Sequence, residues 1–207
     1  ITKHEDNKKL LFLGDIVDRG LESIETLKFV RANVKAGHLA VLGNHEIKLI
    51  NNFYKREKGE APHGSAAVLK TFVDFLREIP EKNQKEYIQW LEKLPIYYVV
   101  KTEKENFVCL HGNIIHFDER TTLRTDMLYG STRAFVKVNE DTDKAYQKLY
   151  NNKVNKYTLI RGHIPQISEQ KNVMSLEEEQ CFEGYLTCLR LDTYLKHFSK
   201  EKAIVRL

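Results

Sequence analysis

The chain has 207 residues, of which 42% are hydrophobic and 30% are charged, and it carries a formal net charge of +4. This composition is typical of a folded globular protein and excludes a disordered or collagen-like chain. No apolar run reaches the roughly 18 residues that a membrane-spanning helix needs. Positive and negative residues are interspersed, which indicates a solvated surface and gives no strong sign of duplex nucleic-acid binding. We also expect free cysteines in a reducing cytoplasm, because they form no CxxC pair and the polar start has no signal-peptide pattern.

Four short apolar runs predict buried strands that end at glycine or polar residues. They lie at residues 9–13, 39–42, 106–110 and 157–160. Between the first two, residues 21–35 carry apolar side chains at helical spacing, and Gly37 stands where a helix C-cap glycine is expected. A strand, a helix and a strand in this order predict a parallel pair with a right-handed crossover.

The second part of the chain changes from a helical to a β pattern. Residues 66–94 are predicted to be mostly helical, and Pro80 divides them into two helices. Further strands are predicted at 96–100, which should pair with 106–110, and at 185–191 and 203–207. The polar stretch 118–156 is interpreted as an insertion over a site. We find no linker or repeat, so we interpret residues 1–207 as a single domain.

Polar side chains follow each of the four apolar strands. They are Asp15 after the first, Asn44 and His45 after the second, His111 after the third and His163 after the fourth. Because ligands of open α/β sheets bind at the carboxyl ends of strands, we expect these side chains to converge. Carboxylate, amide and imidazole donors without a thiolate favour Mn, Fe or Zn. Such a site would bind phosphate and form hydroxide from bound water, and Arg19 is a candidate to hold the phosphate bidentately.

Four motifs carry a resemblance to a known family. They are Gly14-Asp15-Ile-Val-Asp18-Arg19-Gly20, Gly43-Asn44-His45-Glu46, Leu110-His111-Gly112 and Gly162-His163-Ile164-Pro165. Together they resemble the calcineurin-like metallophosphoesterase superfamily, and GDxVDRG followed by GNHE is similar to its phosphoprotein-phosphatase type. Residues 178–190 are similar to the ending of a bacterial subgroup. That subgroup includes diadenosine-tetraphosphate hydrolases, small Ser/Thr phosphatases and the phosphatase module of polynucleotide kinase-phosphatases.

The resemblance implies a fold and a metal centre. The fold would be α/β (α+β), with two mixed β-sheets packed as a sandwich and flanked by helices. The cofactors would be two divalent metal ions, with Mn expected and Fe, Zn or Ni as the other candidates. Asp15 would bridge the two ions, while Asn44, His111 and His163 would complete one of them.

The same resemblance implies roles in catalysis and substrate binding. His45 would protonate the leaving alkoxide, Asp18 would orient His45, and Arg19 would hold the phosphoryl oxygens. Glu178 is a further candidate to contact substrate or a metal-ligating histidine. Its position in a run of three glutamates favours the alternative that it is a surface residue.

One motif of that family is absent from the sequence. Family members carry a GDxHG motif on a strand ahead of GDxVDRG, and its Asp and His complete the other metal site. His4, Glu5 and Asp6 follow no predicted strand, so we interpret them as a solvated segment rather than as substitute ligands. We therefore expect an incomplete second metal site and a domain that lacks its first strand. The favoured explanation is that the motif precedes Ile1 in a longer chain, and the alternative is a protein that has lost one metal.

The predicted function is that of a metal-dependent phosphoesterase that hydrolyses phosphomonoesters with a metal-activated hydroxide. The family-type substrate is phosphorylated Ser or Thr, and the alternatives are a dinucleoside polyphosphate or a nucleic-acid end phosphate. A non-catalytic binding module is the alternative from another functional class. Arg124, Tyr129 and Arg133 in the insertion are candidates to contact a base or a second phosphate, or are plain surface residues.

Overall fold

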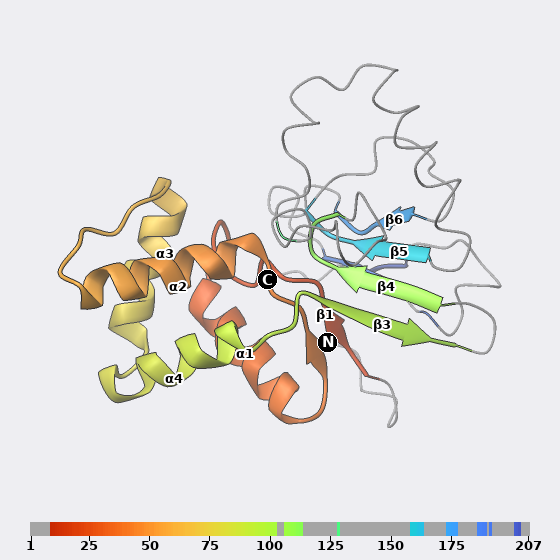
Figure 1. Ribbon diagram of the computed structural model, residues 1–207, viewed down its shortest axis with the longest axis horizontal. Helices are drawn as coiled ribbons and strands as arrows, with labels where there is room; N and C mark the ends of the chain where they lie inside the picture. Colours follow the sequence, from red (N-terminus) through yellow and green to blue (C-terminus); the bar gives the residue numbers. More distant parts are fainter. Residues whose placement is uncertain are drawn as a thin grey trace, which may run out of the picture.

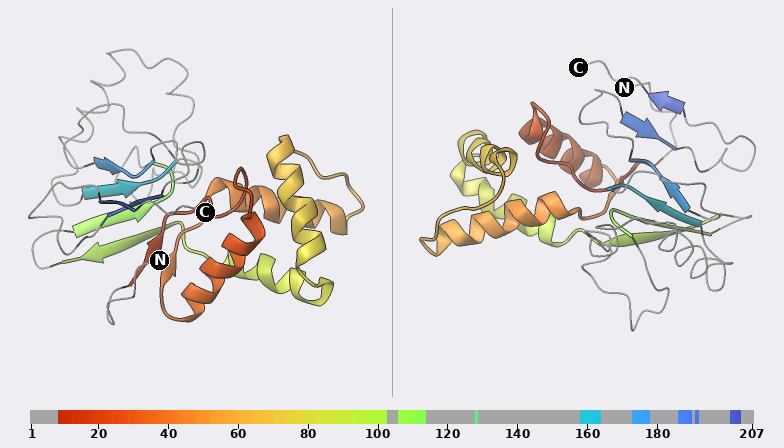
Figure 2. Two further views of the ribbon diagram at one scale, coloured as in Figure 1. Left: turned by 180° about the vertical axis from the view of Figure 1, so that it is seen from behind. Right: turned by 90° about the horizontal axis from the view of Figure 1, so that it is seen from above.

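The structure, a computed structural model, describes residues 9–102, 106–113, 128, 158–163, 173–177, 186–189, 191 and 201–203. The helices gather in one part of the molecule and the larger sheet in the other, with the first two strands between them (Figure 1). The same separation is visible from behind and from above (Figure 2). None of the helices within these residues is long and apolar enough to cross a membrane.

The described residues form four helices and eight strands. The helices are α1 (Ser23–Lys35), α2 (Asn44–Glu57), α3 (Ala66–Glu78) and α4 (Glu81–Glu92). The strands are β1 (Leu11–Phe12), β2 (Leu39–Ala40), β3 (Tyr97–Lys101), β4 (Asn106–Leu110), β5 (Thr158–Arg161), β6 (Val173–Ser175), β7 (Leu186–Cys188) and β8 (Glu201–Ala203).

The strands pair in three groups within the described residues. β1 and β2, which precede and follow α1 along the chain, pair in parallel, as the strand–helix–strand pattern predicts. β3, β4, β5 and β6 form a mixed sheet in that order, with β3 antiparallel to β4 and the next two pairs parallel. β7 and β8 form an antiparallel pair. The expected α/β class, with mixed strand directions and flanking helices, is confirmed.

The helix boundaries follow from local signals in the sequence. α1 ends at Lys35 with Ala36 as its C-cap, and Gly37 then takes φ +99°, a conformation that favours glycine. Pro80 stands at the N-cap of α4, because proline ends one helix and is tolerated at the start of the next. The prediction that Pro80 divides two helices is therefore confirmed.

Two elements were absent from the sequence prediction, and one was displaced. One of the absent elements is α2, which buries Leu49, Ile50 and Phe53 at helical spacing. Because its first turn is polar, the start of this helix shows no apolar periodicity. β6 is only three residues long, so periodicity cannot identify it. The strand predicted at 203–207 is observed as β8, which begins two residues earlier, while residues 204–207 lie outside the described part.

Two apolar cores pack against the chain around β1. The larger core packs the inner faces of all four helices together, with Leu27, Phe75 and Leu91 fully buried. Burial of each such side chain contributes about 1.5–3 kcal/mol to folding. The smaller core packs the four-stranded sheet against Leu11 and Leu13, so the chain around β1 is held from both sides.

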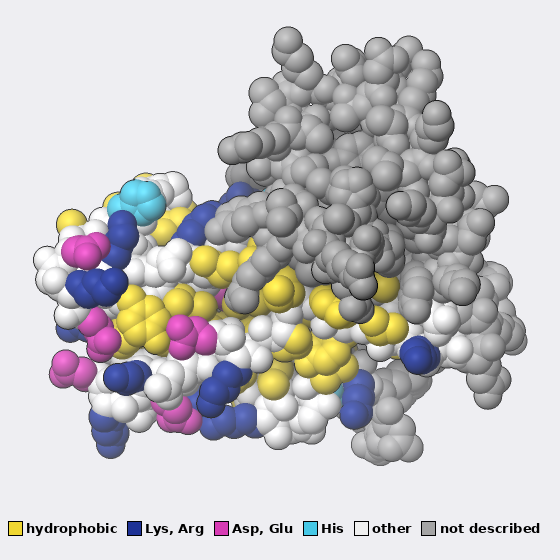
Figure 3. All heavy atoms as spheres, viewed as in Figure 1, with side chains coloured by type: hydrophobic (Ala, Val, Ile, Leu, Met, Phe, Trp, Pro, Cys, Tyr) yellow, Lys and Arg dark blue, Asp and Glu magenta, His cyan; other side chains and the backbone are white. Residues whose placement is uncertain are grey.

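The remaining sequence expectations concern thiols and surface charge. Cys109 and Cys188 are free, as expected, and burial raises the pKa of Cys109 to about 12. Cys181 lies outside the described residues. Figure 3 shows Lys, Arg, Asp and Glu side chains intermixed over the helical end of the visible face, which agrees with the interspersed charges of the sequence.

Candidate functional site

The loop after β1 has an unusual backbone. Gly14, Asp15, Asp18 and Arg19 take φ values of 80°, 50°, 73° and 64°. Residues with a side chain rarely adopt this left-handed region, and each such residue costs about 1–3 kcal/mol unless its surroundings hold it. Contacts from α2 must therefore hold this loop in place.

Glu46, in the first turn of α2, supplies those contacts. Its Oε1 accepts the backbone N–H groups of Ile16 at 2.7 Å and Val17 at 3.2 Å. Its Oε2 accepts those of Asp15 at 3.0 Å and Gly43 at 2.9 Å. The side chain is fully buried, and burial together with the Asp15 charge raises the pKa of Glu46 to about 7. One carboxyl group thus joins the loop after β1 to the start of α2.

The close approach of these two segments requires glycine at position 43. A Cβ there would lie 2.3 Å from the backbone nitrogen of Asp15 and 2.6 Å from its Oδ1. The Asp15 Oδ1 also accepts the backbone N–H of His45 at 3.2 Å. The N-terminus of α2 therefore faces the Asp15 carboxylate, an arrangement that its dipole stabilises.

Four of the predicted metal ligands meet at this point. The ligand atoms of Asp15, His111 and His163 all lie within 4.8 Å of one another. The Nε2 of His111 is 3.0 Å from Oδ1 of Asp15 and 3.0 Å from Oδ1 of Asn44. Residues that are far apart in the sequence thus direct oxygen and nitrogen donors toward a common point.

The environment of His111 fits a cation at that point. Its Nδ1 donates to the carbonyl oxygen of Leu13 at 2.8 Å, so Nε2 is the nitrogen that faces the oxygens of Asp15 and Asn44. Burial lowers the pKa of His111, but the hydrogen bond to Asp15 and its charge outweigh this, so the pKa lies above its ordinary value. A divalent cation in place of a proton on Nε2 would interact favourably with Nε2 and with the facing oxygens of Asp15 and Asn44. A backbone carbonyl on the other ring nitrogen is the usual support for a metal-bound histidine.

His163 is suited to the same role. It follows β5, takes φ 56° and places its ring 4.9 Å from that of His111. Burial and the positive charge of His111 lower its pKa to about 4, and Arg19 adds to this effect. The imidazole is therefore neutral near pH 7, the form in which histidine binds a metal. Arg19 itself is exposed.

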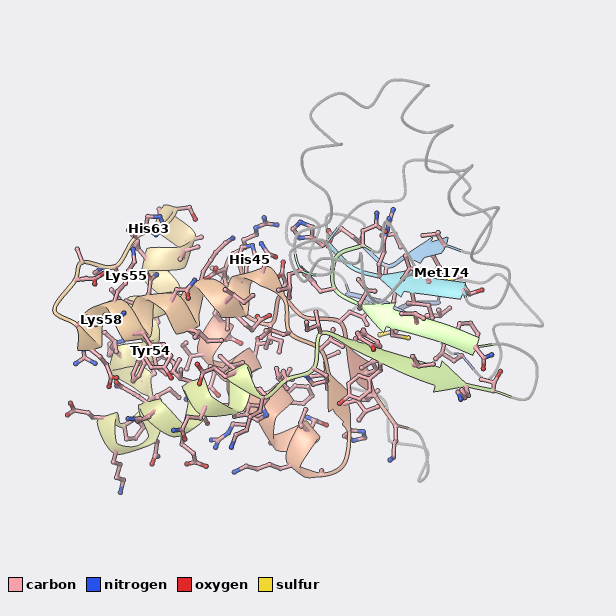
Figure 4. All side chains as sticks on the ribbon, in the orientation of Figure 1. His45, Tyr54, Lys55, Lys58, His63 and Met174 are labelled. Carbon is pink, nitrogen blue, oxygen red and sulfur yellow. The ribbon has the colours of Figure 1, made fainter. Side chains whose placement is uncertain are left out.

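His45 and Asp18 form a buried pair beside the cluster. The His45 Nδ1 lies 2.6 Å from Oδ2 of Asp18, and the two side chains are 6% and 2% exposed. With Nδ1 donating to the carboxylate, Nε2 is the nitrogen that faces the site, 3.7 Å from Oδ2 of Asp15. In Figure 4, His45 lies at the end of α2 nearest the sheet.

Two side chains of this site are not predicted from the sequence. One is Glu46 of the GNHE motif, although its position in the first turn of a helix is a capping signal. The other is Lys48, whose Nζ lies 3.3 Å from the Nε2 of His45. The spacing of three residues between His45 and Lys48 places these two side chains on one face of a helix, so a prediction of α2 would have paired them. Glu178, Arg124, Tyr129 and Arg133 lie outside the described residues.

Three curated proteins that resemble this chain are named as bis(5'-nucleosyl)-tetraphosphatases, two asymmetrical and one symmetrical. The chain is 27% identical to the asymmetrical bis(5'-nucleosyl)-tetraphosphatase PrpE of Oceanobacillus iheyensis, over 91% of this chain and 76% of that protein. It is 34% identical to the protein of the same name from Geobacillus thermodenitrificans, over 63% of this chain and 54% of that protein. It is 35% identical to the symmetrical bis(5'-nucleosyl)-tetraphosphatase of Aromatoleum aromaticum, over 44% of this chain and 30% of that protein. The chain thus matches only part of each relative's length.

A solved structure shows the fold, and a sequence profile shows the family. A crystal structure described as a candidate diadenosine tetraphosphatase has a TM-score of 0.56 and 15% sequence identity, and the match covers 88% of this chain and 76% of that chain. At this identity the likeness shows the fold alone. The sequence profile of the family described as Calcineurin-like phosphoesterase matches residues 1–195. This chain therefore belongs to the calcineurin-like phosphoesterase family, whose members are metal-dependent hydrolases of phosphoric ester bonds.

Proposed function

We propose that this chain hydrolyses phosphoric ester or anhydride bonds with the help of Mn(II), and that dinucleoside polyphosphates are its favoured substrates. The observation that carries the proposal is the convergence of Asp15, Asn44, His111 and His163 on one point. The substrate class is supported by the curated relatives, which are named as bis(5'-nucleosyl)-tetraphosphatases.

The four converging side chains would hold the divalent cation. Its contribution when bound would be to polarise a phosphoryl oxygen and to lower the pKa of a bound water. The Leu13 carbonyl fixes His111 in the tautomer that this requires, and Glu46 holds the backbone on which Asp15 is carried. In the described residues these donors make one complete set, so the second ion of the sequence-based prediction stays a prediction.

The remaining side chains would act on the substrate itself. His45 would give the proton on Nε2 to the oxygen of the leaving group, because Nδ1 is already engaged by Asp18. Arg19 would hold the phosphoryl oxygens with its planar guanidinium group. The exposure of Arg19 agrees with this role, since a substrate arrives from solvent.

Hydrolysis of phosphorylated Ser or Thr is the second candidate. The buried His45–Asp18 pair favours it, because an alcohol leaving group needs a proton from a positioned acid. A nucleotide leaving group is less dependent on that proton, since a phosphate has a second pKa of about 6.

A substrate panel tests the proposal. The complete chain, with Mn(II) added, would be assayed on diadenosine tetraphosphate, a phosphoserine peptide, 3′-phosphorylated RNA and para-nitrophenyl phosphate. We expect the highest kcat/KM on diadenosine tetraphosphate, and we expect chelator or the substitution His111→Ala to abolish turnover of every substrate. Activity that survives chelation would overturn the metal-dependent mechanism. Binding of Mn(II) without any turnover would support the non-catalytic alternative.

A further inference from the structure

Lys48 is a charged side chain at the site, and neither the sequence prediction nor the proposed function gives it a role. It lies on α2 one turn after His45 and is half-buried, and its Nζ lies 3.3 Å from the Nε2 of His45. The Nδ1 of the same ring is engaged by Asp18 at 2.6 Å. The ammonium group of Lys48 therefore lies against the ring nitrogen that faces the site.

This position places Lys48 on the leaving-group side of the reaction. The oxygen that receives a proton from Nε2 must come within about 2.6–3.2 Å of that atom. Lys48 Nζ lies 3.3 Å from the same Nε2, so the ammonium group is at most about 6.5 Å from the leaving oxygen when substrate is bound. The Nζ is thus within reach of the atoms attached to that oxygen.

What is attached to the leaving oxygen differs between the two candidate substrate classes. In a phosphoserine peptide or para-nitrophenyl phosphate it is an uncharged carbon group. In a dinucleoside polyphosphate it is a second phosphate, which carries negative charge and accepts hydrogen bonds from lysine. A cation at this position therefore discriminates between the two classes.

We propose that Lys48 binds the phosphate of the leaving group and makes the site selective for substrates whose leaving group carries a phosphate. The inference rests on the proposed function and extends it to the choice of substrate. Hydrolysis forms a bond from a water oxygen to the attacked phosphorus and breaks the bond from that phosphorus to the bridging oxygen. The electron pair stays on the bridging oxygen, which takes the proton of His45 and lies near the charge of Lys48. One proton of the water stays on the attacking oxygen, and the other leaves to solvent.

A matched pair of lysines on α2 tests the inference. Lys55 lies two helical turns beyond Lys48 on the same face, about 10 Å farther along the axis, and Figure 4 shows it toward the opposite end of α2 from His45. The variants are Lys48→Met, which keeps the length of the stem, Lys48→Arg, which keeps the charge, and Lys55→Met as the control. Each is assayed with Mn(II) on diadenosine tetraphosphate and on para-nitrophenyl phosphate.

We expect Lys48→Met to lower kcat/KM on diadenosine tetraphosphate by about 10- to 100-fold, the effect of one lost charge-assisted hydrogen bond. We expect less than about a threefold change on para-nitrophenyl phosphate, near-normal values for Lys48→Arg, and no change on either substrate for Lys55→Met. Equal losses on both substrates would overturn the inference, because Lys48 would then act through His45. Unchanged values for Lys48→Met would overturn it as well.

A binding measurement separates this inference from the proposed function. Titration calorimetry with Mn(II) present would compare ADP, whose extra phosphate can reach Lys48, with inorganic phosphate, which is held at the metal. We expect Lys48→Met to weaken ADP by about tenfold and to leave phosphate unchanged. If the unmodified chain turns over no substrate, the proposed function fails. The ADP comparison then still decides the role of Lys48, and an unchanged ADP affinity would contradict it.

Discussion

At the scale of single residues, backbone strain coincides with the candidate site. Asp15, Asp18, Arg19 and His163 are the non-glycine residues with positive φ in the described part of the chain, and each was predicted from sequence to act in the site. Such conformations persist only where the surrounding structure holds them, and they gather where function needs a particular side-chain direction. The Glu46 hydrogen bonds supply this support for the loop after β1.

The His45–Asp18 pair yields a prediction at this scale. We expect His45→Ala to lower kcat on a phosphoserine peptide by about 10²–10⁴-fold, the usual contribution of a positioned acid. We expect Asp18→Asn to cause a smaller loss, because the amide keeps a hydrogen-bond acceptor but removes the charge that stabilises the protonated ring. Steady-state kinetics at saturating Mn(II) provides the measurement.

His63→Ala is the control for that experiment. His63 lies near the start of α3, well away from His45 (Figure 4), and its hydrogen bonds to Asn52 use backbone atoms that alanine retains. Its activity should equal that of the unmodified chain. Full activity of His45→Ala would show that this histidine is not the acid.

At the scale of elements, the first two turns of α2 carry most of the site's chemistry. Asn44 contributes an amide oxygen to the cluster, His45 its ring, Glu46 the support for the neighbouring loop, and Lys48 a cation. The helix N-terminus adds a partial positive charge that favours the Asp15 carboxylate and an anionic substrate. The position of one helix therefore determines how these groups face one another.

Replacement of Glu46 tests this dependence on α2. In Glu46→Gln one carboxylate oxygen becomes an NH₂ group, which cannot accept the backbone N–H groups that this oxygen now accepts. We expect the free energy of unfolding to fall by about 2–4 kcal/mol, because buried donors lose their acceptor. Urea denaturation measures the change. Glu57→Gln, at the exposed end of the same helix, should change it by less than about 0.5 kcal/mol, and an equal effect of the two substitutions would contradict this account.

At the scale of the whole molecule, the site lies where two strand pairings meet. β1 and β2 are parallel, so Asp15 and Asn44 both follow the carboxyl ends of this strand pair. β4 and β5 are also parallel, with Leu110 opposite Arg161. His111 and His163 therefore both follow the carboxyl ends of this second pair. The hydrogen bond from His111 to the Leu13 carbonyl and the packing of the smaller core connect the two strand pairs. The four side chains proposed as metal ligands come together only when both pairings have formed.

This arrangement predicts that a metal stabilises the fold as a unit. Mn(II) at 100 times its Kd should raise the free energy of unfolding by about 2.7 kcal/mol, because the separated ligands of the unfolded chain bind it weakly. A thermal shift on addition of Mn(II), reversed by chelator, is the expected result. His111→Ala should remove the shift, whereas His63→Ala should retain it. A midpoint that does not respond to Mn(II) would contradict the assignment of the four ligands.

The local sequence determined the elements whose signals are contiguous. The strand–helix–strand start, the break at Pro80 and the β3–β4 hairpin follow from periodicity and from proline and glycine positions, and the structure has all three. The donors at strand ends could also be named, because strand direction alone brings carboxyl ends together. The polar first turn of α2 concealed that helix from the same reasoning.

Only the tertiary structure decided which backbone groups Glu46 accepts and which ring nitrogen Lys48 faces. Glu46 bonds the loop that precedes it by about 30 residues, and no periodicity relates those positions. Lys48 reaches His45 because α2 is a helix and because Asp18, from a separate loop, turns the ring. A chain folds its elements from neighbouring residues, but the orientation of a side chain in a site depends on contacts that packing alone creates.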